Sequence, residues 1–182
     1  GILMAQGLGI ASERIQGVND NMSQSHYHEY YEIYYLEAGE RFHMVEDQLY
    51  KMEAGEFMIF PPYVMHHSYG EENIPFKRLL LYFKPEEILW PSVRDALKEE
   101  SGIYRTDIKK RQEIHRVMED ILKEQKDPGA FHEEYDRGML NVLLLLIARE
   151  KRPEKAPGKS SRIGEVIRYI CLLYTSPSPR DA

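Results

Sequence analysis

The chain has little cysteine, no long apolar run and no recognisable export signal. Its one cysteine among 182 residues is Cys171, so a disulfide framework or a cysteine-ligated metal site is excluded. The longest apolar run, residues 142–148, is far shorter than the roughly 20 residues that a membrane-spanning helix needs. The opening residues 1–4 are apolar but too few, without a basic flank, for a secretory signal. We therefore expect a cytoplasmic protein with no membrane segment.

Basic residues are also scarce in the first part of the chain. Residues 1–75 contain three basic residues against twelve acidic ones, whereas residues 149–168 contain seven against three. Contacts to nucleic-acid phosphates need clustered Lys and Arg, so the first part is a poor candidate for DNA binding. The chain also lacks a Gly-x-Ser-x-Gly motif and a phosphate-binding glycine loop, so nucleophilic catalysis has no support.

The part that follows residue 30 contains many short apolar segments separated by Gly, Pro and acidic turns. This pattern is typical of a β-sandwich or barrel. Tyr31, Ile33 and Tyr35 alternate with Glu32 yet are also apolar, which predicts that both faces of this strand are covered. The expected strands are 31–37, 41–46, 48–52, 56–60 and 77–83.

The apolar period changes to that of helices after residue 84. Residues 107–126 and 131–150 each place apolar side chains on one helical face, and Asp127-Pro-Gly separates them. So short a connection predicts an antiparallel helix pair. Three leucines widen the apolar face of the second helix and form a candidate dimer surface, the alternative being that they pack on the back of the barrel: Leu140, Leu144 and Leu145.

The candidate site combines residues from two segments. His26, His28 and Glu32 share one face if their strand is unbroken, and His66 comes from a second segment. Three imidazoles and one carboxylate can bind a divalent metal such as Zn, Fe, Mn or Ni. The same side chains can instead hydrogen-bond an organic effector, together with Tyr30 and Tyr34 of the same parity, or they can be structural histidines.

The other histidines have weaker claims on this site. His43, on the next strand, can line the barrel or face solvent, and His67 is expected to point away from His66. His115 and His132 lie on the expected helices, so we expect them at the surface.

The two segments resemble the signature motifs of the cupin superfamily. The first has His26, His28, Glu32 and Gly39, and the second has Gly55, Pro61 and His66. The chain departs from the usual motifs at three positions, where the family has Gly, Gly and Asn: Asp20, Tyr63 and Gly70.

Residues 26–36 and 60–67 are more specifically similar to the N-terminal cupin sensor domain of AraC-type transcription regulators. This resemblance implies a jelly-roll barrel followed by a helix hairpin, which binds a small molecule such as a sugar and forms a homodimer. It also implies that DNA is bound by a separate helix-turn-helix domain. The alternative is a stand-alone metal-dependent cupin enzyme, an isomerase or dioxygenase, because the four ligand residues are all present.

The expected domain organisation follows from these assignments. Residues 1–90 form the effector-binding barrel, 91–150 the helical hairpin for dimerisation, and 151–161 a polar linker. Residues 162–170 open a helix, expected to be the first of the truncated DNA-binding domain. Residues 171–182 contain two prolines that a helix cannot continue through, and they resemble a translated sequencing adapter.

Overall fold

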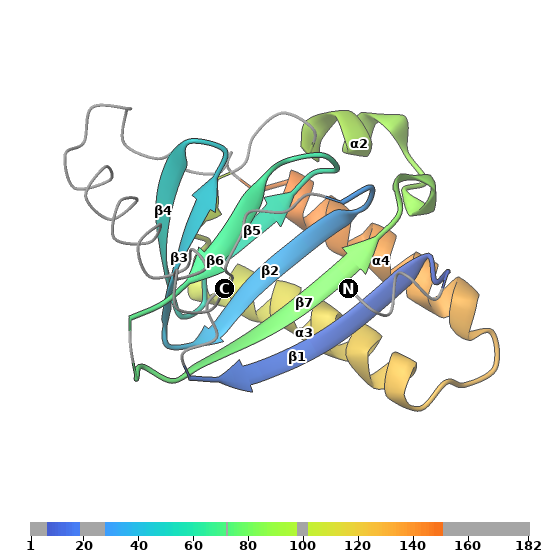
Figure 1. Ribbon diagram of the computed structural model, residues 1–182. Helices are drawn as coiled ribbons and strands as arrows, with labels where there is room; N and C mark the ends of the chain where they lie inside the picture. Colours follow the sequence, from blue (N-terminus) through green and yellow to red (C-terminus); the bar gives the residue numbers. More distant parts are fainter. Residues whose placement is uncertain (1–6, 19–27, 72, 98–101, 151–182) are drawn as a thin grey trace, which may run out of the picture.

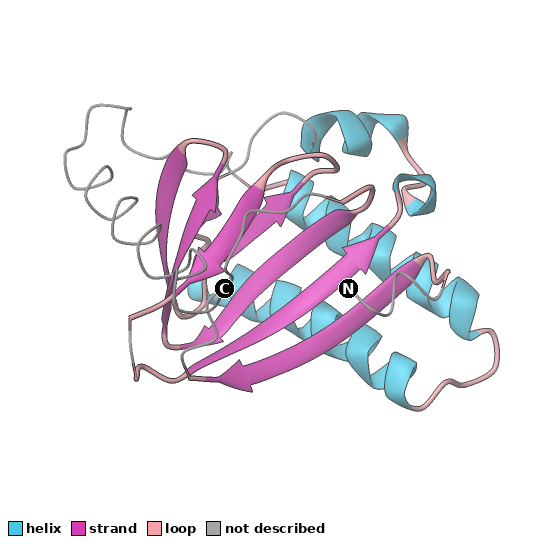
Figure 2. Ribbon diagram, viewed as in Figure 1, coloured by secondary structure: helices cyan, strands magenta, loops and turns pink. Residues whose placement is uncertain are grey.

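The computed structural model describes residues 7–18, 28–71, 73–97 and 102–150 of the chain. Strands come first and the longer helices follow, as Figures 1 and 2 show. The strands are β1 (Ile10–Gly17), β2 (Tyr31–Ala38), β3 (Glu40–Val45), β4 (Gln48–Glu53), β5 (Phe57–Phe60), β6 (His66–Tyr69), β7 (Phe76–Phe83) and β8 (Ile103–Tyr104). The helices are η1 (Pro85–Glu87), α2 (Pro91–Leu97), α3 (Ile108–Lys126) and α4 (His132–Ala148).

The strands form two antiparallel sheets. One sheet has the order β1-β7-β2-β5-β8, and the other has the order β4-β3-β6. The chain passes from the first sheet to the second at Gly39, whose φ of +86° favours glycine. A Cβ at this position would lie 2.4 Å from the carbonyl oxygen of Pro75, so no larger residue fits without backbone movement. The expected mainly β fold with helices at its C-terminal side is confirmed.

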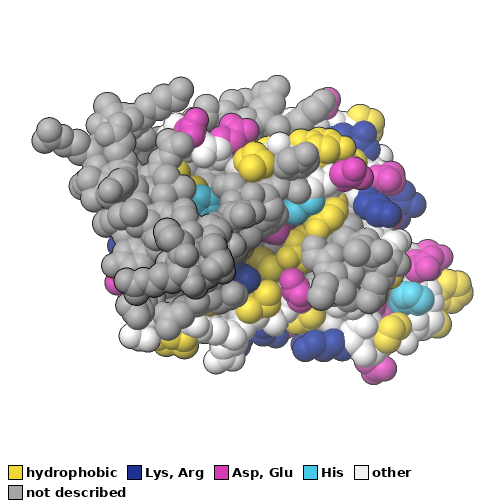
Figure 3. Space-filling model, viewed as in Figure 1, with side chains coloured by type: hydrophobic (Ala, Val, Ile, Leu, Met, Phe, Trp, Pro, Cys, Tyr) yellow, Lys and Arg dark blue, Asp and Glu magenta, His cyan; other side chains and the backbone are white. Residues whose placement is uncertain are grey.

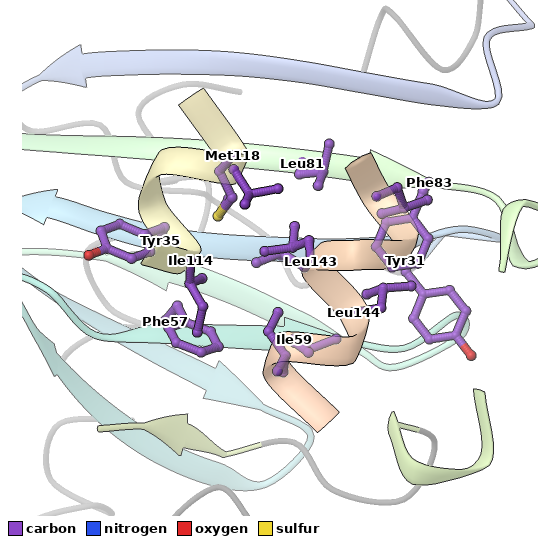
Figure 4. Close-up of a cluster of buried hydrophobic side chains, with 14 of the residues drawn as sticks. Tyr31, Tyr35, Phe57, Ile59, Leu81, Phe83, Ile114, Met118, Leu143 and Leu144 are labelled. Carbon is purple, nitrogen blue, oxygen red and sulfur yellow. The ribbon is translucent and has the colours of Figure 1, made fainter. Parts of the chain in front are cut away.

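Helices α3 and α4 cover the outer face of the five-stranded sheet (Figure 1). Asp107 caps α3 by accepting a hydrogen bond from the backbone N–H of Lys110, an interaction typical of helix N-termini. Alternate strand side chains such as Tyr31, Tyr35 and Leu81 meet apolar side chains of both helices (Figure 4). The expected covered outer face is therefore present, and it forms the larger apolar core.

This packing corrects the assignment of Leu140 and Leu144 to a dimer surface. Both side chains are 0% exposed within the single chain and belong to the core between α4 and the sheet. The alternative, packing on the back of the barrel, describes them correctly. Only Leu145 of the three is exposed, at 37%.

The five expected strands and two expected helices are confirmed to within one or two residues at each end. Strands β1, β6 and β8 and helix α2 were not expected. Strand β1 carries Ser12, Glu13, Arg14 and Gln16, so its sequence reads as polar, and its pairing with β7 defines it as a strand. Strand β6 has only four residues, two of which are histidines, so its sequence shows no apolar pattern that would predict a strand.

Several sequence-based assignments lie outside the described residues. They are His26, the linker 151–161, the helix 162–170 and the tail 171–182. Among the helices that the structure describes, none is long and apolar enough to cross a membrane.

Candidate functional site

The site lies on the inner face of the barrel, where β2 turns Glu32 away from the helices. Strand alternation places Glu32 opposite in direction to its neighbours Tyr31 and Ile33. The Glu32 carboxylate lies between two imidazoles: Oε1 is 3.6 Å from Nε2 of His28, and Oε2 is 3.6 Å from Nε2 of His66. Glu32 and His66 are 6% and 2% exposed. The structure therefore brings three of the four predicted ligands together, and His26 lies outside the described residues.

Backbone carbonyl groups fix the orientation of both imidazoles. Nδ1 of His28 lies 2.8 Å from the carbonyl oxygen of Tyr30, and Nδ1 of His66 lies 2.9 Å from that of Val64. A carbonyl oxygen only accepts, so in both rings Nδ1 carries the proton and donates it. Each Nε2 is thereby directed at Glu32 with either a lone pair or a second proton.

The charges of the three groups are coupled. Burial alone would raise the pKa of Glu32, but the neighbouring His28 and His66 outweigh it and hold that pKa well below its usual range. Burial likewise opposes the charged form of His66, yet Glu32 and the Val64 carbonyl raise its pKa above the usual value. A carboxylate between two imidazoles thus favours a cation at this point, either a proton on an imidazole or a metal ion.

These three residues fit a metal ion by the chemistry of their donor atoms. Two ligands at about 2.1 Å from one tetrahedral metal ion lie roughly 3.4 Å apart, close to the separations observed here. The donor atoms of His28, Glu32 and His66 all lie within 4.8 Å of one another. The hydrogen bonds at Nδ1 also leave Nε2 as the coordinating atom, as in many metal sites.

Aromatic side chains surround this cluster. The ring of Tyr30 stacks on His28 at 4.1 Å, and Phe60 stacks on His66 at 4.1 Å. Tyr82 meets both His28 and Tyr30 edge-on, and its hydroxyl donates to a carboxylate oxygen of Glu13. The predicted residue Tyr30 is therefore at the site. Phe60 and Tyr82 were missed, because only strand register shows that they face inward: each pairs with Glu32 from one side.

His43 and Tyr34 lie deeper in the barrel, on the inner faces of β3 and β2. Their rings are 4.3 Å apart and nearly perpendicular, and His43 is 0% exposed. Burial, followed by the positive charge of Arg41, lowers the pKa of His43 well below its usual value, so its imidazole is neutral. Of the two positions left open for His43 by the sequence, the structure selects the barrel interior.

A second cluster, on the outer side of the sheet, corrects the expectation for His115. Its Nε2 lies 2.6 Å from a Glu37 carboxylate oxygen, and its ring packs against Tyr35, so it joins α3 to β2 instead of facing only solvent. Arg14 pairs with Glu37 at 2.7 Å and also contacts Glu119. Arg14 contacts both carboxylates and His115 contacts Glu37, so this cluster is an ion-pair network that fastens α3 to the sheet.

The side of the molecule that carries the inner face is seen in the space-filling view. Figure 3 shows histidine and acidic side chains beside a strip of hydrophobic ones on the side of the molecule away from α3 and α4. The fold and the site together define a class of small antiparallel β-barrels with a buried polar cluster on the inner face and helices on the outer face.

Comparison with known proteins identifies the family. The family model described as AraC-like ligand binding domain matches residues 10–145, and the chain belongs to this family. Among solved structures, apo ToxT from Vibrio cholerae is similar with a TM-score of 0.55 and 9% identity, over 90% of this chain and 64% of that one. A cupin protein from Bacteroides fragilis aligns with 43% of this chain and 68% of its own, at 18% identity and a TM-score of 0.40.

A third solved structure, oxalate decarboxylase from Bacillus subtilis, aligns at 18% identity and a TM-score of 0.38, over 45% of this chain and 23% of that one. No curated protein matches the chain.

Proposed function

We propose that this chain is the effector-sensing domain of an AraC-type transcription regulator. The observation that carries the proposal is the buried cluster of His28, Glu32 and His66 inside a barrel whose family is a ligand-binding domain. Such a cluster offers donors and acceptors to a small organic molecule, while Tyr30 and Phe60 provide flat apolar surfaces beside it. A sugar is one effector with this chemistry.

Strand β2 supplies a route from the effector to the helices. Glu32 and Tyr34 face the barrel interior, whereas Ile33 and Tyr35, between and beside them, pack in the core shared with α3 and α4. A ligand that binds one arrangement of β2 more tightly shifts the population of the helix positions by its difference in affinity. In a regulator this shift is passed to DNA-binding helix-turn-helix domains, which read the operator.

The helical segment 91–150 is proposed to form the homodimer, and the barrel 1–90 to bind the effector. Because Leu140 and Leu144 are buried, the dimer surface proposed here uses the exposed side of α4 instead. Its apolar residues are spaced by seven and three along the helix: Tyr135, Val142 and Leu145. This spacing matches the seam of paired helices.

A second candidate function, a metal-dependent enzyme, rests on the fit of the same three residues to a divalent ion. His28, Glu32 and His66 would hold the metal, which when bound supplies Lewis-acid chemistry. Tyr30 and Tyr82 would then orient a substrate beside it, and Phe60 would exclude water from one side. The fold is compatible with both functions.

One experiment separates the two candidates. Metal content of the full chain is measured by elemental mass spectrometry after purification without chelators, and Zn²⁺ binding is then titrated by calorimetry. Stoichiometric metal that is lost in His66→Ala but kept in His67→Ala would establish the metal centre. His67 is the matched control, because it follows His66 on β6 but points to the outer side, against Tyr69.

The sensor proposal has its own positive test. In a metal-free chain, thermal-shift measurements with a panel of monosaccharides and small organic acids should find a compound that raises the unfolding temperature. Glu32→Gln should remove that rise, since it keeps the shape of the side chain but removes the charge and replaces one acceptor oxygen by an N–H donor group. If no compound in the panel stabilises the chain and Zn²⁺ does, the sensor proposal is contradicted and the metal-centre alternative stands.

A further inference from the structure

A second polar layer lies beneath the cluster of His28, Glu32 and His66. His43 pairs with Ser68 across β3 and β6, two residues from the pair formed by Val45 and His66. Two residues along a strand correspond to about 6.7 Å, so His43 is displaced from His66 by about that distance along the strands. Phe60 separates the two layers, with its ring stacked on His66 and tilted against His43.

Two side chains of this layer are buried without a hydrogen-bond partner among the described residues. They are His43, at both ring nitrogens, and Tyr34, at its hydroxyl. Both are buried, with 0% and 2% exposure. Buried polar side chains are nearly always hydrogen-bonded to protein, water or ligand, so these two mark a place that another molecule completes.

The side chains around His43 and Tyr34 are rich in hydrogen-bond donors. Arg41 is 1% exposed and donates to the Ser68 hydroxyl at 2.8 Å, and its guanidinium lies 4.2 Å from the centre of the Phe76 ring. Arg78 lies over the same ring at 5.4 Å and over the Tyr34 ring at 5.6 Å. A guanidinium is positively charged and has five N–H donors and no acceptor, so both arginines bring donor groups close to Tyr34 and His43.

An environment rich in hydrogen-bond donors, with guanidinium groups nearby, favours ligands that carry an anionic oxygen group. Carboxylates and phosphates accept several charge-assisted hydrogen bonds at once, whereas a neutral hydroxyl or amide accepts fewer and weaker ones. The outer layer differs from it, because Glu32 places a carboxylate, which only accepts hydrogen bonds, between His28 and His66. A ligand that spans the two layers is therefore oriented by charge.

We propose that the effector carries an oxyanion group, a carboxylate or a phosphate, which binds at the inner layer formed by Tyr34, His43, Arg41 and Arg78. This inference rests on the proposed function of the barrel as an effector site. The oxyanion accepts from the Tyr34 hydroxyl and from one N–H of His43, while the guanidinium groups supply the positive charge. The other end of the effector, with hydroxyl or amine donors, faces Glu32 and the outer imidazoles.

The test uses charged probes and their neutral counterparts on the full chain. Lactate, benzoate and inorganic phosphate are compared with lactamide, benzamide and glycerol by thermal shift, and Kd is then measured by calorimetry. We expect at least one anion to raise the unfolding temperature while its neutral counterpart does not. Stabilisation by lactate or benzoate assigns a carboxylate effector, and stabilisation by phosphate alone assigns a phosphorylated one.

Two variants and two matched controls connect the binding to the inner layer. Tyr34→Phe and His43→Phe should each weaken binding of the anion about tenfold or more, the effect of removing one hydrogen bond to a charged group. Tyr35→Phe and His67→Phe should leave Kd unchanged. Tyr35 follows Tyr34 on β2 but faces the helices, and His67 lies on β6, the neighbour of β3, but faces away from the barrel interior. Tyr34→Phe removes only a hydroxyl group, so this variant is expected to fold. It therefore tests the inference even if His43→Phe does not fold.

The outcomes distinguish failure of this inference from failure of the proposed function. If neutral probes stabilise the chain as well as anions do, or if Kd is unchanged in Tyr34→Phe, the oxyanion inference is overturned and effector binding stands. If no probe of either kind stabilises the wild-type chain, both are contradicted.

Discussion

The two faces of the five-stranded sheet differ in composition, although the same strands form both: the outer face is apolar and the inner face carries buried polar groups. On the outer face Tyr31, Ile33 and Tyr35 of β2 join a continuous apolar core with the helices. On the inner face the same strand presents Glu32, Tyr34 and Leu36, and Glu32 is a buried charge. Further buried polar side chains face the barrel from other strands: Arg41, His43, His66, Ser68 and Arg78.

The difference shows where stability and function reside in this domain. Burial of apolar surface stabilises the fold by about 25 cal/mol per Å², and the outer face consists of this kind of contact. Burial of charged and polar groups opposes folding unless they are paired, so an inner face of this composition does not serve stability alone. We infer that helices α3 and α4 hold the barrel in shape, which leaves its interior available for binding.

The largest effect is expected from truncating the outer core. Leu144→Ala should lower the free energy of unfolding by about 3 kcal/mol, because it leaves a cavity between α4 and the sheet. Chemical denaturation monitored by circular dichroism gives the value. The adjacent Leu145→Ala is the control and should change the stability by less than about 0.5 kcal/mol, since Leu145 is exposed. Equal effects of the two changes would contradict the burial of Leu144.

A pH-dependent effect is expected at the inner cluster. His66 has a raised pKa, so its stabilisation is complete below the unfolded value of 6.5 and is lost as pH rises through the folded one. Glu32 has a lowered pKa, so its stabilisation is complete above the unfolded value of 4.5 and is lost as pH falls through the folded one. Together the two residues stabilise the fold most between pH 4.5 and 6.5.

Replacing the carboxylate tests this coupling. In the metal-free chain, Glu32→Gln should lower the free energy of unfolding by about 2 kcal/mol inside that window, because it leaves the buried, protonated His66 without the opposite charge that lies 3.6 Å away. The difference from wild type should shrink as the pH rises above 6.5 and through the raised pKa of His66. A difference that does not vary with pH, measured by urea denaturation at several pH values, would mean that His66 and Glu32 are not coupled.

A smaller effect of opposite sign is expected one layer deeper. Tyr34→Phe should leave the stability of the ligand-free chain unchanged or raise it by up to about 1 kcal/mol, because it removes a buried hydroxyl that no described residue satisfies. Differential scanning calorimetry with Tyr35→Phe as control measures this effect. A clear loss of stability in Tyr34→Phe would show that the hydroxyl is already satisfied in the folded chain.

The smallest effect on stability is expected at the exposed side of α4. Leu145→Glu should change the free energy of unfolding by less than about 0.5 kcal/mol, yet it should weaken self-association if this side forms the dimer. Sedimentation velocity measures the change, with Glu134→Gln on an exposed turn of the same helix as control. An unaltered sedimentation coefficient in Leu145→Glu would exclude this part of α4 from the interface.

The sequence by itself determined the mainly β architecture, the helix pair and three inner-face residues of the site. Hydrophobic periodicity and the punctuation by Gly and Pro are local properties, and they identified β2 and α3 closely. The even spacing of His28 and Glu32 predicted that they share a face of the chain, because side-chain alternation along a strand is also a local property. Together with His66 they were therefore predicted to form a cluster.

Only the tertiary structure decided which surfaces are covered and which strands are neighbours. Leu140 and Leu145 look alike in sequence, yet the sheet covers the first and leaves the second exposed. His43 and Tyr34 became an inner layer, and Phe60 and Tyr82 joined the site, through pairing of strands distant in the chain. The physical reason is that burial and strand register are set by contacts between distant segments, which no local pattern specifies.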